Sequence, residues 1–511
     1  MKSISITNYK AFSTGELDIK PLTIILGANS SGKSSLLQLF LMLEQTLNSN
    51  DNDDFLKLNG HYVNLGESEN IFKDRSSNKT LELKFEINYS EFMQNVRMEL
   101  EPLKDLSQLY SFLSSYSNGK TSTENNDSIQ LVSENPWKFS KETIQNSIML
   151  ENFILKLKKV EGYESRIKKI RSSLALFEEL KEYVPKKKKL YVKFQFRLQS
   201  NKLLLESHSI IIDDKVLVNY SPQKQPCFGS EMFTLSLFKQ HLDYSNEPNL
   251  DYDGLKIKNN IDDNILYKLF IVCEKQICRF FESERIDYIG PLRAYPQRYY
   301  FLDGSDGYTV KSGEGLANIL KKHTLVKTKV NQWLNKFGLS IDISVFKDII
   351  HNIKVSQNNI KLDLTDVGFG LSQVLPILVQ GFLTKPNSTT IIEQPEIHLH
   401  PKMQAELVDL FLDILNLSKD NKKYRKRFII ETHSEYFLKR LRRRIAEGTI
   451  SSADVAIYFI EGRSEESDSA KIKRVKVDSD GSIDWPKDFY ITEMDDDLAF
   501  LKLKTKVSHP Q

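Results

Sequence analysis

Short runs of hydrophobic residues open the chain, and an apolar helix follows them. Alternation at Ile4 and Ile6 and the apolar run Leu22–Leu26 predict two strands. A glycine-rich turn comes next, and residues 34–45 (SSLLQLFLMLEQ) have the composition of a buried helix. The chain therefore begins with a strand, loop and helix unit.

Strands of a second kind lie further along the chain. Leu81–Ile87 and Tyr191–Leu198 alternate apolar with polar residues, and Leu203–Val218 continues with further short strands. Strict alternation is typical of antiparallel sheets with one buried face. We therefore expect an antiparallel β-subdomain.

The sequence between these strands has a different character. Residues 114–143 are dominated by Ser, Asn, Lys, Glu and Thr, which is typical of a loop, whereas residues 151–183 recover helical spacing. A mainly helical, polar insertion is expected here. A long helix at about 264–281 and a short strand at 287–290 come next.

The composition is that of a globular protein. Of the 511 residues, 40% are hydrophobic and 27% charged, and the net charge of +3 argues against a polycation that coats nucleic acid. The opening residues lack the pattern of a secretory signal, and no apolar stretch is long enough for a membrane span. The three cysteines fit neither a zinc nor a redox spacing. A cytoplasmic location without a membrane partner is expected.

A phosphate-binding motif connects the strand Leu22–Leu26 to the helix that follows it. Residues 27–34 read GANSSGKS and match G-x-x-x-x-G-K-[ST], in which backbone amides and a helix N-terminus bind phosphate oxygens. Lys33 would neutralise the terminal phosphates, and the Ser34 hydroxyl would ligate Mg²⁺. An ordinary Gly/Ser turn would not require the flanking strand and helix. The expected nucleotide contacts are Gly27, Asn29, Ser30, Ser31, Gly32, Lys33, Ser34 and Ser35.

The C-terminal half supplies two strands that end in polar residues. Thr389–Pro401 (TTIIEQPEIHLHP) places Glu393 where a carboxylate would associate with Mg²⁺. Phe428–Ser434 (FIIETHS) places His433 where it can touch a terminal phosphate. A lone histidine is usually a loop residue, but its position after such a strand favours a switch role.

A second helix N-terminus precedes the first of these strands. Gly368–Pro376 (GFGLSQVLP) places Gly370 and Ser372 at the start of an apolar helix, where a phosphate would bind. Two such anion sites are redundant in one chain unless the second faces the nucleotide of a partner across a two-fold axis. A head-to-head dimer or a higher oligomer is therefore expected.

In this order the motifs resemble the ABC-like ATPases of the RecF/SMC/OLD class. The resemblance is carried by NYKAF, GANSSGKSS, GFGLSQVLP, EQPEIHLHP and ETHS. Within that class YIGPLRAYPQRYY, ETHSEYFLKRLRRRIAEG and DGSIDWPKDF are similar to the PtuA-type ATPase subunits of Septu antiphage systems and their retron-associated relatives. The resemblance implies ATP and Mg²⁺ as cofactors and a PtuB-like HNH nuclease as partner. In the retron-associated case it also implies a reverse transcriptase with its RNA and DNA.

The implied architecture is an α/β fold. It is an ABC-type P-loop ATPase head, with a mixed sheet and an antiparallel β-subdomain, interrupted by the helical insertion. The expected parts are the N-terminal half of the head (1–90), the insertion (91–190), β-subdomain strands and a connecting helix (191–285), the C-terminal half (286–460) and a small extension (461–511).

One position departs from the pattern of this class. Its members typically carry Asp followed by Glu at the end of the strand, and the glutamate polarises the attacking water, whereas this chain has Glu393 followed by Gln394. Glutamine cannot accept a proton but can orient water. The catalytic candidates are thus Glu393, Gln394, His433 and the nearby Glu396, and slow hydrolysis typical of a switch is expected.

Two alternatives remain open. Glu461 followed by Asp478 and Asp480 suggests an OLD-type nuclease, although the stretch between these acids is short and polar. A RecF-like DNA-repair ATPase is the other alternative.

Basic and histidine-rich segments carry less specific signals. Residues 186–189, 422–427 and 439–444 are either solvated helix faces or surfaces for nucleic acid. His398 and His400 suggest a metal site less strongly than a loop that supports an interface.

Overall fold

The computed structural model describes two compact units of the chain. The larger unit comprises Lys2–Asn50, Lys57–Leu81 and Phe280–Gln511, and the smaller unit comprises Met1, Asp51–Leu56 and Glu82–Arg279. The described residues are 1–49, 55–76, 79–100, 172–180, 189–222, 227–232, 252–253, 255–257, 265–281, 286–293, 295–301, 315–346, 350–358, 360–383, 387–417, 426–465 and 467–485.

The larger unit is built on a mixed six-stranded sheet. Its order is β11 (Ile286–Ile289), β16 (Thr389–Glu393), β17 (Arg427–Glu431), β3 (Leu22–Gly27), β18 (Val455–Glu461) and β19 (Lys471–Val475). The first five strands run parallel, and β19 is antiparallel to β18. Every residue of β3 and β16 is buried, as expected for strands covered on both faces.

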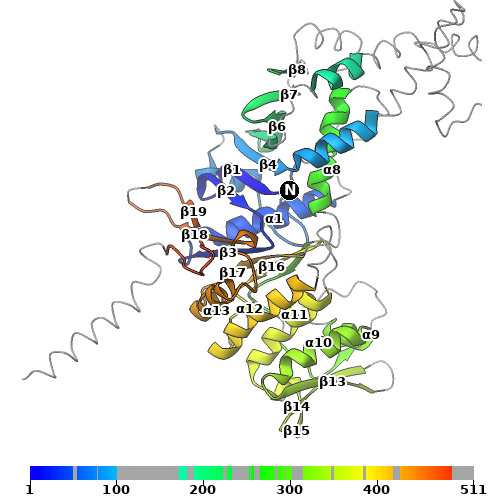
Figure 1. The fold of residues 1–511 in the computed structure, drawn as a ribbon, viewed down its shortest axis with the longest axis vertical. Coiled ribbons are helices and arrows are strands. Elements are labelled where there is room, and N and C mark those ends of the chain that lie inside the picture. Colours follow the sequence, from blue (N-terminus) through cyan, green and yellow to red (C-terminus); the bar gives the residue numbers. More distant parts are fainter. Residues whose placement is uncertain are drawn as a thin grey trace, which may run out of the picture. The chain divides into compact units, whose positions relative to one another are not determined.

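Helices cover both faces of this sheet. In Figure 1, α1 (Lys33–Leu47) lies on one side, and α11 (Phe369–Leu383), α12 (Pro401–Asn416) and α13 (Glu435–Ala446) gather on the other. The apolar side chains of α11, α12 and α13 form one core with alternate residues of β3, among them Ile24. This packing holds the loops at the strand ends, where the sequence placed the phosphate-binding motif.

Two further parts of the larger unit were not anticipated. A meander of β13 (Leu339–Phe346), β14 (Ile350–Gln357), β15 (Ile360–Asp363) and β12 (Tyr300–Phe301) packs with the helices α9 (Leu316–Lys322) and α10 (Thr324–Asn335). Near the N-terminus, β1 (Ser3–Tyr9) and β2 (Phe12–Asp18) form a hairpin, of which only the first strand was expected.

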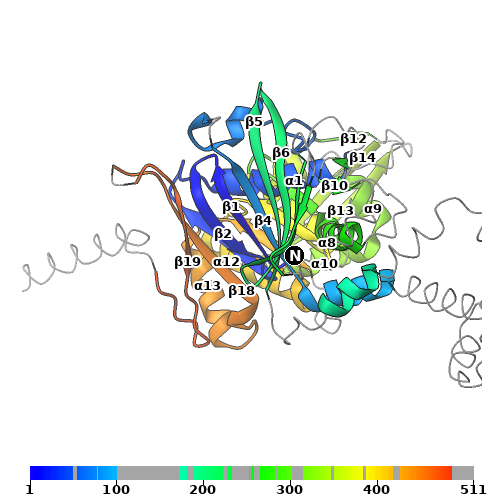
Figure 2. The same cartoon turned by 90° about the horizontal axis from the view of Figure 1, so that it is seen from above.

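The smaller unit contains the expected antiparallel strands. Strands β4 (Leu81–Ile87), β5 (Leu190–Gln199), β6 (Lys202–Ile212), β7 (Lys215–Ser221) and β8 (Cys227–Gly229) follow one another in a sheet, and Figure 2 shows β5 and β6 as long ribbons. The other described elements are β9 (Tyr252–Asp253), β10 (Lys256–Ile257) and α8 (Ile265–Phe281).

These observations confirm the fold class, an α/β fold with a mixed sheet and an antiparallel β-subdomain. Of the expected insertion, residues 91–100 and 172–180 are described and helical, while residues 114–143 lie outside the described part. The expected boundary between 460 and 461 falls inside β18, so the segment after it adds the edge strand β19 to the sheet. Among the described helices none is long and apolar enough to cross a membrane.

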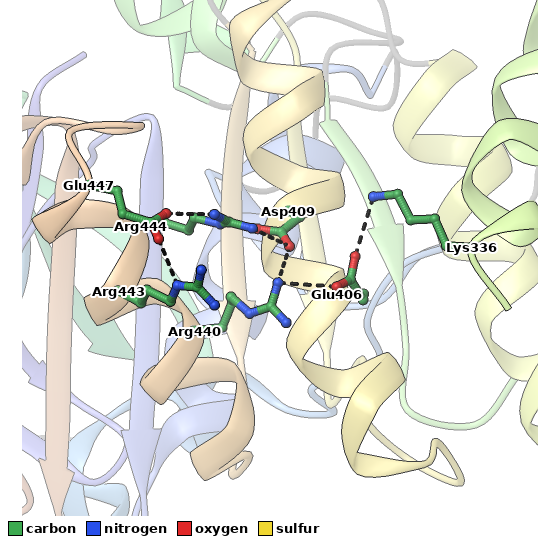
Figure 3. Close-up of polar contacts among 7 residues, drawn as sticks. All are labelled: Lys336, Glu406, Asp409, Arg440, Arg443, Arg444 and Glu447. Atoms are coloured by element: carbon green, nitrogen blue, oxygen red, sulfur yellow. Dashed lines mark hydrogen bonds and ion pairs between the residues drawn. The ribbon is translucent and has the colours of Figure 1, made fainter.

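An ion-pair network joins α12 to α13 (Figure 3). Asp409 of α12 accepts hydrogen bonds from Arg440 and from Arg444, whose Nε lies 2.6 Å from Oδ1. Arg440 also donates to Glu406 at 3.1 Å. Asp409 is only 8% exposed, and the two arginines compensate the negative charge that is buried there.

We predict that Asp409→Ala destabilises the protein. Loss of the carboxylate leaves two half-buried arginines without a shared acceptor, which should lower the free energy of unfolding by about 1–3 kcal/mol. Arg443→Ala is the control, because Arg443 pairs with Glu447 on the surface with 65% of its side chain exposed, and it should cost less than about 0.5 kcal/mol. Urea and thermal unfolding of both variants measure the difference, and equal effects would contradict a buried network.

Candidate functional site

The phosphate-binding loop connects the end of β3 to the start of α1. Gly27 and Gly32 adopt φ values of 148° and 111°, which side chains rarely tolerate. A Cβ at Gly27 would come within 2.5 Å of the Ile460 carbonyl oxygen of the neighbouring strand. The exposed surface of this loop is formed by Ala28, Asn29 and Ser30, and Ser34 is exposed in the first turn of α1.

Lys33 lies within this loop and faces the sheet. It is 4% exposed, and its Nζ donates to the carbonyl oxygens of Gly27 at 3.1 Å and Ala28 at 2.7 Å. Nζ also lies 3.7 Å from Oε1 of Glu431. Burial lowers the pKa of the amine, and the charge of Glu431 opposes that shift. Lys33 thus stands where a phosphate would meet both the loop and the acidic strand ends.

Glu393 stands at the end of β16, beside the loop. One of its oxygens accepts a hydrogen bond of 2.8 Å from the hydroxyl of Tyr288, on the adjacent strand β11. Burial raises the pKa of Glu393, whereas the bond from Tyr288 and the charge of Lys33 oppose the rise. Tyr288 is therefore a site residue that the sequence alone did not single out.

Gln394 follows Glu393 in a strained turn. Its φ of 44° lies in the left-handed region that residues other than glycine rarely adopt. Its backbone N–H donates to the backbone carbonyl of Glu431 at 2.8 Å, and its own backbone carbonyl accepts from Nη2 of Arg293 at 3.1 Å. The position that departs from the pattern of related ATPases is therefore fixed by backbone contacts on two sides.

Glu431 ends β17 and is an acidic residue of the site that the sequence analysis missed. It pairs in register with Glu393 and is 4% exposed, and its Oε2 makes no hydrogen bond within the described part of the chain. Burial and then the charge of Glu393 raise its pKa to about 7, against the opposing effect of Lys33. The sequence contained a signal for this residue, because Glu431 directly follows the apolar run at 428–430. The structure shows that this strand pairs with β3.

Glu396 and His433 are held together. The Thr432 hydroxyl donates to Glu396 Oε2 at 2.8 Å, and the His433 amide donates to Oε1 at 2.6 Å. Both carboxylate oxygens are thus engaged, so Glu396 positions the segment that carries His433. Partial burial and the charge of Lys33 lower the pKa of His433, which leaves a neutral imidazole at pH 7.

Gly370 and Ser372 lie in the first turn of α11. A Cβ at Gly370 would approach the His398 carbonyl oxygen to 2.6 Å, and the buried Ser372 hydroxyl donates to the Phe369 carbonyl at 2.7 Å. In the described residues these two make no hydrogen bond to the P-loop of their own chain. The described contacts therefore do not join the two predicted phosphate sites.

The other candidate segments are engaged in internal contacts. In the run 439–444 four of the six residues bind carboxylates, and Arg442 donates to the Gly481 carbonyl. This favours a structural role for that run, while 422–425 and 186–188 lie outside the described residues.

Two of the three acidic residues of the nuclease alternative pair with lysines, and the third, Asp480, accepts hydrogen bonds from the backbone N–H and the hydroxyl of Ser482. Glu461 pairs with Lys473 across the β18–β19 ladder, and Asp478 pairs with Lys476 at 3.0 Å. Among the described residues no group of three or more His, Cys, Asp or Glu side chains is arranged to hold a metal ion, and this covers His398 and His400.

The loop fits the phosphates of a nucleotide accompanied by Mg²⁺. The two glycines leave a cradle that a Cβ would fill, and the buried Ser31 hydroxyl has no hydrogen-bond partner within the described structure. Ser34 and Glu393 supply the oxygen donors that Mg²⁺ prefers. A strand, a glycine-rich loop and a helix beside acidic strand ends define a P-loop nucleotide-binding protein.

Comparison with known proteins gives the family. The model of the AAA ATPase domain matches residues 1–438, and the chain belongs to this family. It is also similar to the SMC head domain from Thermotoga maritima, with 9% identity over 93% of this chain and 99% of that chain and a TM-score of 0.34. No curated protein matches the chain. The family confirms the coarser prediction, an ATPase of the P-loop kind.

Glu431 gives a pH-dependent prediction. Its pKa is raised from 4.5 to about 7 in the folded protein, so its contribution to stability is complete below pH 4.5 and is lost as the pH rises through 7. A shift of this size corresponds to about 3 kcal/mol. The stability of Glu431→Gln relative to that of the wild type should therefore be higher at pH 8 than at pH 4.5.

Melting temperatures of both proteins, without nucleotide and with a chelator, measure this difference. Glu435→Gln on α13 removes one negative charge outside the site and serves as the control. Parallel melting curves for wild type and Glu431→Gln across this pH range would contradict the prediction.

Proposed function

We propose that this chain is an ATP-binding, slowly hydrolysing switch subunit of an antiphage defence complex that controls an HNH nuclease. The ATPase family supports nucleotide binding. The motifs shared with the RecF/SMC/OLD class and, more narrowly, with Septu and retron-associated ATPases support the defence role. In this proposal ATP and Mg²⁺ bind between two heads, and the bound state restrains the nuclease.

The observation that carries the proposal is the chemistry at Gln394. The residue directly after Glu393 carries a side-chain amide. Its backbone N–H is bonded to the end of β17, which pairs with the P-loop strand β3. An amide can orient a water molecule but cannot take its proton, so the ATP state should be long-lived. The nearest alternative base, Glu396, already accepts two hydrogen bonds from Thr432 and His433. Long occupancy suits a switch better than a motor.

Exposed aromatic and aliphatic side chains support a dimer. Leu292 is 94% exposed and Tyr295 79% exposed. The ring of Tyr295 lies 5.2 Å from that of Phe369 at the start of α11, and Phe369 in turn contacts the ring of His398 at 4.9 Å. Apolar groups of this size on the surface favour a protein interface. A second head covering them would bring its Gly370 and Ser372 toward the nucleotide.

The first functional prediction concerns Gln394→Glu. A carboxylate at this position should supply a general base and speed hydrolysis by about 10²-fold or more if proton transfer limits the rate. The faster variant should restrain its nuclease less well, because the ATP-bound state is shorter. Single-turnover ATP hydrolysis and phage plating, in cells that carry the chain with its genomic neighbours, measure both effects.

Gln394→Asn is the matched control, since it keeps an amide and should leave hydrolysis slow. An unchanged rate in Gln394→Glu, together with a robust wild-type activity that Glu396→Gln abolishes, would identify Glu396 as the base. The slow-switch proposal would then fail. Restraint of the nuclease that persists in the faster variant would refute the regulatory half alone.

The second prediction tests the shared site. Lys33→Ala removes the phosphate contact in one chain, while Gly368→Arg blocks the exposed start of α11 in the other, where an added Cβ meets nothing within 4 Å. Neither variant should hydrolyse ATP by itself. A mixture should recover about a quarter of the wild-type activity, because half of the dimers are mixed and each mixed dimer has one intact site.

ATP affinity of each variant, measured separately, provides the control for this mixing experiment. Lys33→Ala should lose binding and Gly368→Arg should retain it. A mixture no more active than the sum of its parts, or a fully active Gly368→Arg variant, would reject hydrolysis across a dimer.

A further inference from the structure

Arg293 is a buried charge four residues beyond the end of β11. Strand β11 runs parallel to β16, with Ile289 opposite Ile392, so the segments that follow both strands lie at the same sheet edge. The Arg293 side chain is buried, with the residue 7% exposed, and burial lowers its pKa to about 10. Its guanidinium therefore remains charged at neutral pH in a place where an uncompensated charge would be unfavourable.

The contacts of this guanidinium all concern one turn. Nη2 donates to the carbonyl oxygen of Glu393 at 2.9 Å and to that of Gln394 at 3.1 Å. Nε and Nη1 make no hydrogen bond in the described part of the chain, while the charge of Glu396 stabilises the protonated form. Arg293 thus bridges two successive carbonyls that would otherwise repel each other.

The turn held in this way is the strained one. A left-handed conformation at a non-glycine residue costs of the order of 1–3 kcal/mol and persists only where the surroundings impose it. Three contacts impose it on Gln394: the bond of its amide to Glu431, the bond of the Ile397 amide to its carbonyl at 3.3 Å, and Arg293. The direction of the Gln394 side chain follows from this backbone conformation.

We propose that Arg293 is a positioning residue for ATP hydrolysis, which fixes the turn at Gln394 through its guanidinium without touching the nucleotide. This inference rests on the proposed hydrolytic function. A misplacement of the water-orienting amide should lower the rate of the chemical step and leave phosphate binding at the P-loop intact.

The test compares Arg293→Ala with the wild type in single-turnover hydrolysis. The rate constant should fall by about 10²-fold, as misplaced catalytic groups typically cause, while the ATP affinity changes by less than about threefold. Millimolar guanidinium should restore part of the rate by filling the vacated space, and sodium chloride at equal ionic strength should not. Arg293→Lys, which keeps the charge, should be intermediate.

Arg427→Ala is the matched control. Arg427 is also an arginine whose pKa is lowered by burial, but it begins β17 at the opposite end from Glu431 and lies 5.5 Å from the Phe280 ring. This variant should retain the wild-type rate of hydrolysis. A loss of rate equal to that of Arg293→Ala would mean that any buried arginine of this sheet has the same effect, and the inference would be overturned.

Amide hydrogen exchange provides a second readout that does not depend on turnover. In Arg293→Ala the backbone amides of Gln394, Ile397 and Leu399, which are hydrogen-bonded in this turn, should exchange faster, and those of α12 should not. Unchanged exchange in this turn, an unchanged rate of hydrolysis, or loss of ATP binding together with the fold would overturn the role of Arg293. Absence of hydrolysis in the wild type would refute the proposed hydrolytic function, and the exchange data would still decide whether Arg293 holds the turn.

Discussion

Strands β3, β16 and β17 run parallel and in register, so that Gly27, Glu393 and Glu431 reach the same edge of the sheet. The amine of Lys33 projects between these ends and interacts with the charges of both glutamates. Burial raises the pKa of both carboxylates, and the charge of Glu393 raises that of Glu431 further, because one amine cannot fully compensate two buried carboxylates at low dielectric. A divalent cation bound with the nucleotide would offset this accumulation of buried negative charge.

Two loops of this site are mechanically connected. Glu396, after the turn at Gln394, binds both Thr432 and the His433 amide, and the Gln394 amide binds the Glu431 carbonyl. The segments following β16 and β17 therefore cannot shift independently without breaking buried hydrogen bonds. A displacement at His433 would therefore be transmitted to Gln394. The hydrogen bond from Arg293 to Gln394 couples the segment after β11 to the same turn.

Much of this arrangement could be predicted from local patterns. The P-loop and the strands at 389–393 and 427–431 are short apolar runs next to distinctive polar residues, so periodicity and motif agree. The meander at 339–363 was missed although Leu339, Ile341 and Ile343 alternate with polar residues and its strands pair as sequence-adjacent hairpins, because no distinctive motif marks this region. Arg293 and Tyr288 were missed for a related reason: each acts on β16 from about 100 residues away, which no spacing rule reveals.

The position of β3 in the sheet has a consequence for how the protein is made. Its two neighbours are β17 and β18, at Arg427–Glu431 and Val455–Glu461. The phosphate-binding strand therefore has neither of its partners until roughly 400 further residues have been synthesised, which takes on the order of 20–80 s at ribosomal rates of about 5–20 residues per second. During that interval the run Leu22–Leu26 is a hydrophobic segment with unpaired backbone groups. The nascent chain therefore carries this strand without its partners through most of translation, and the ATPase site can form only after translation has passed β18.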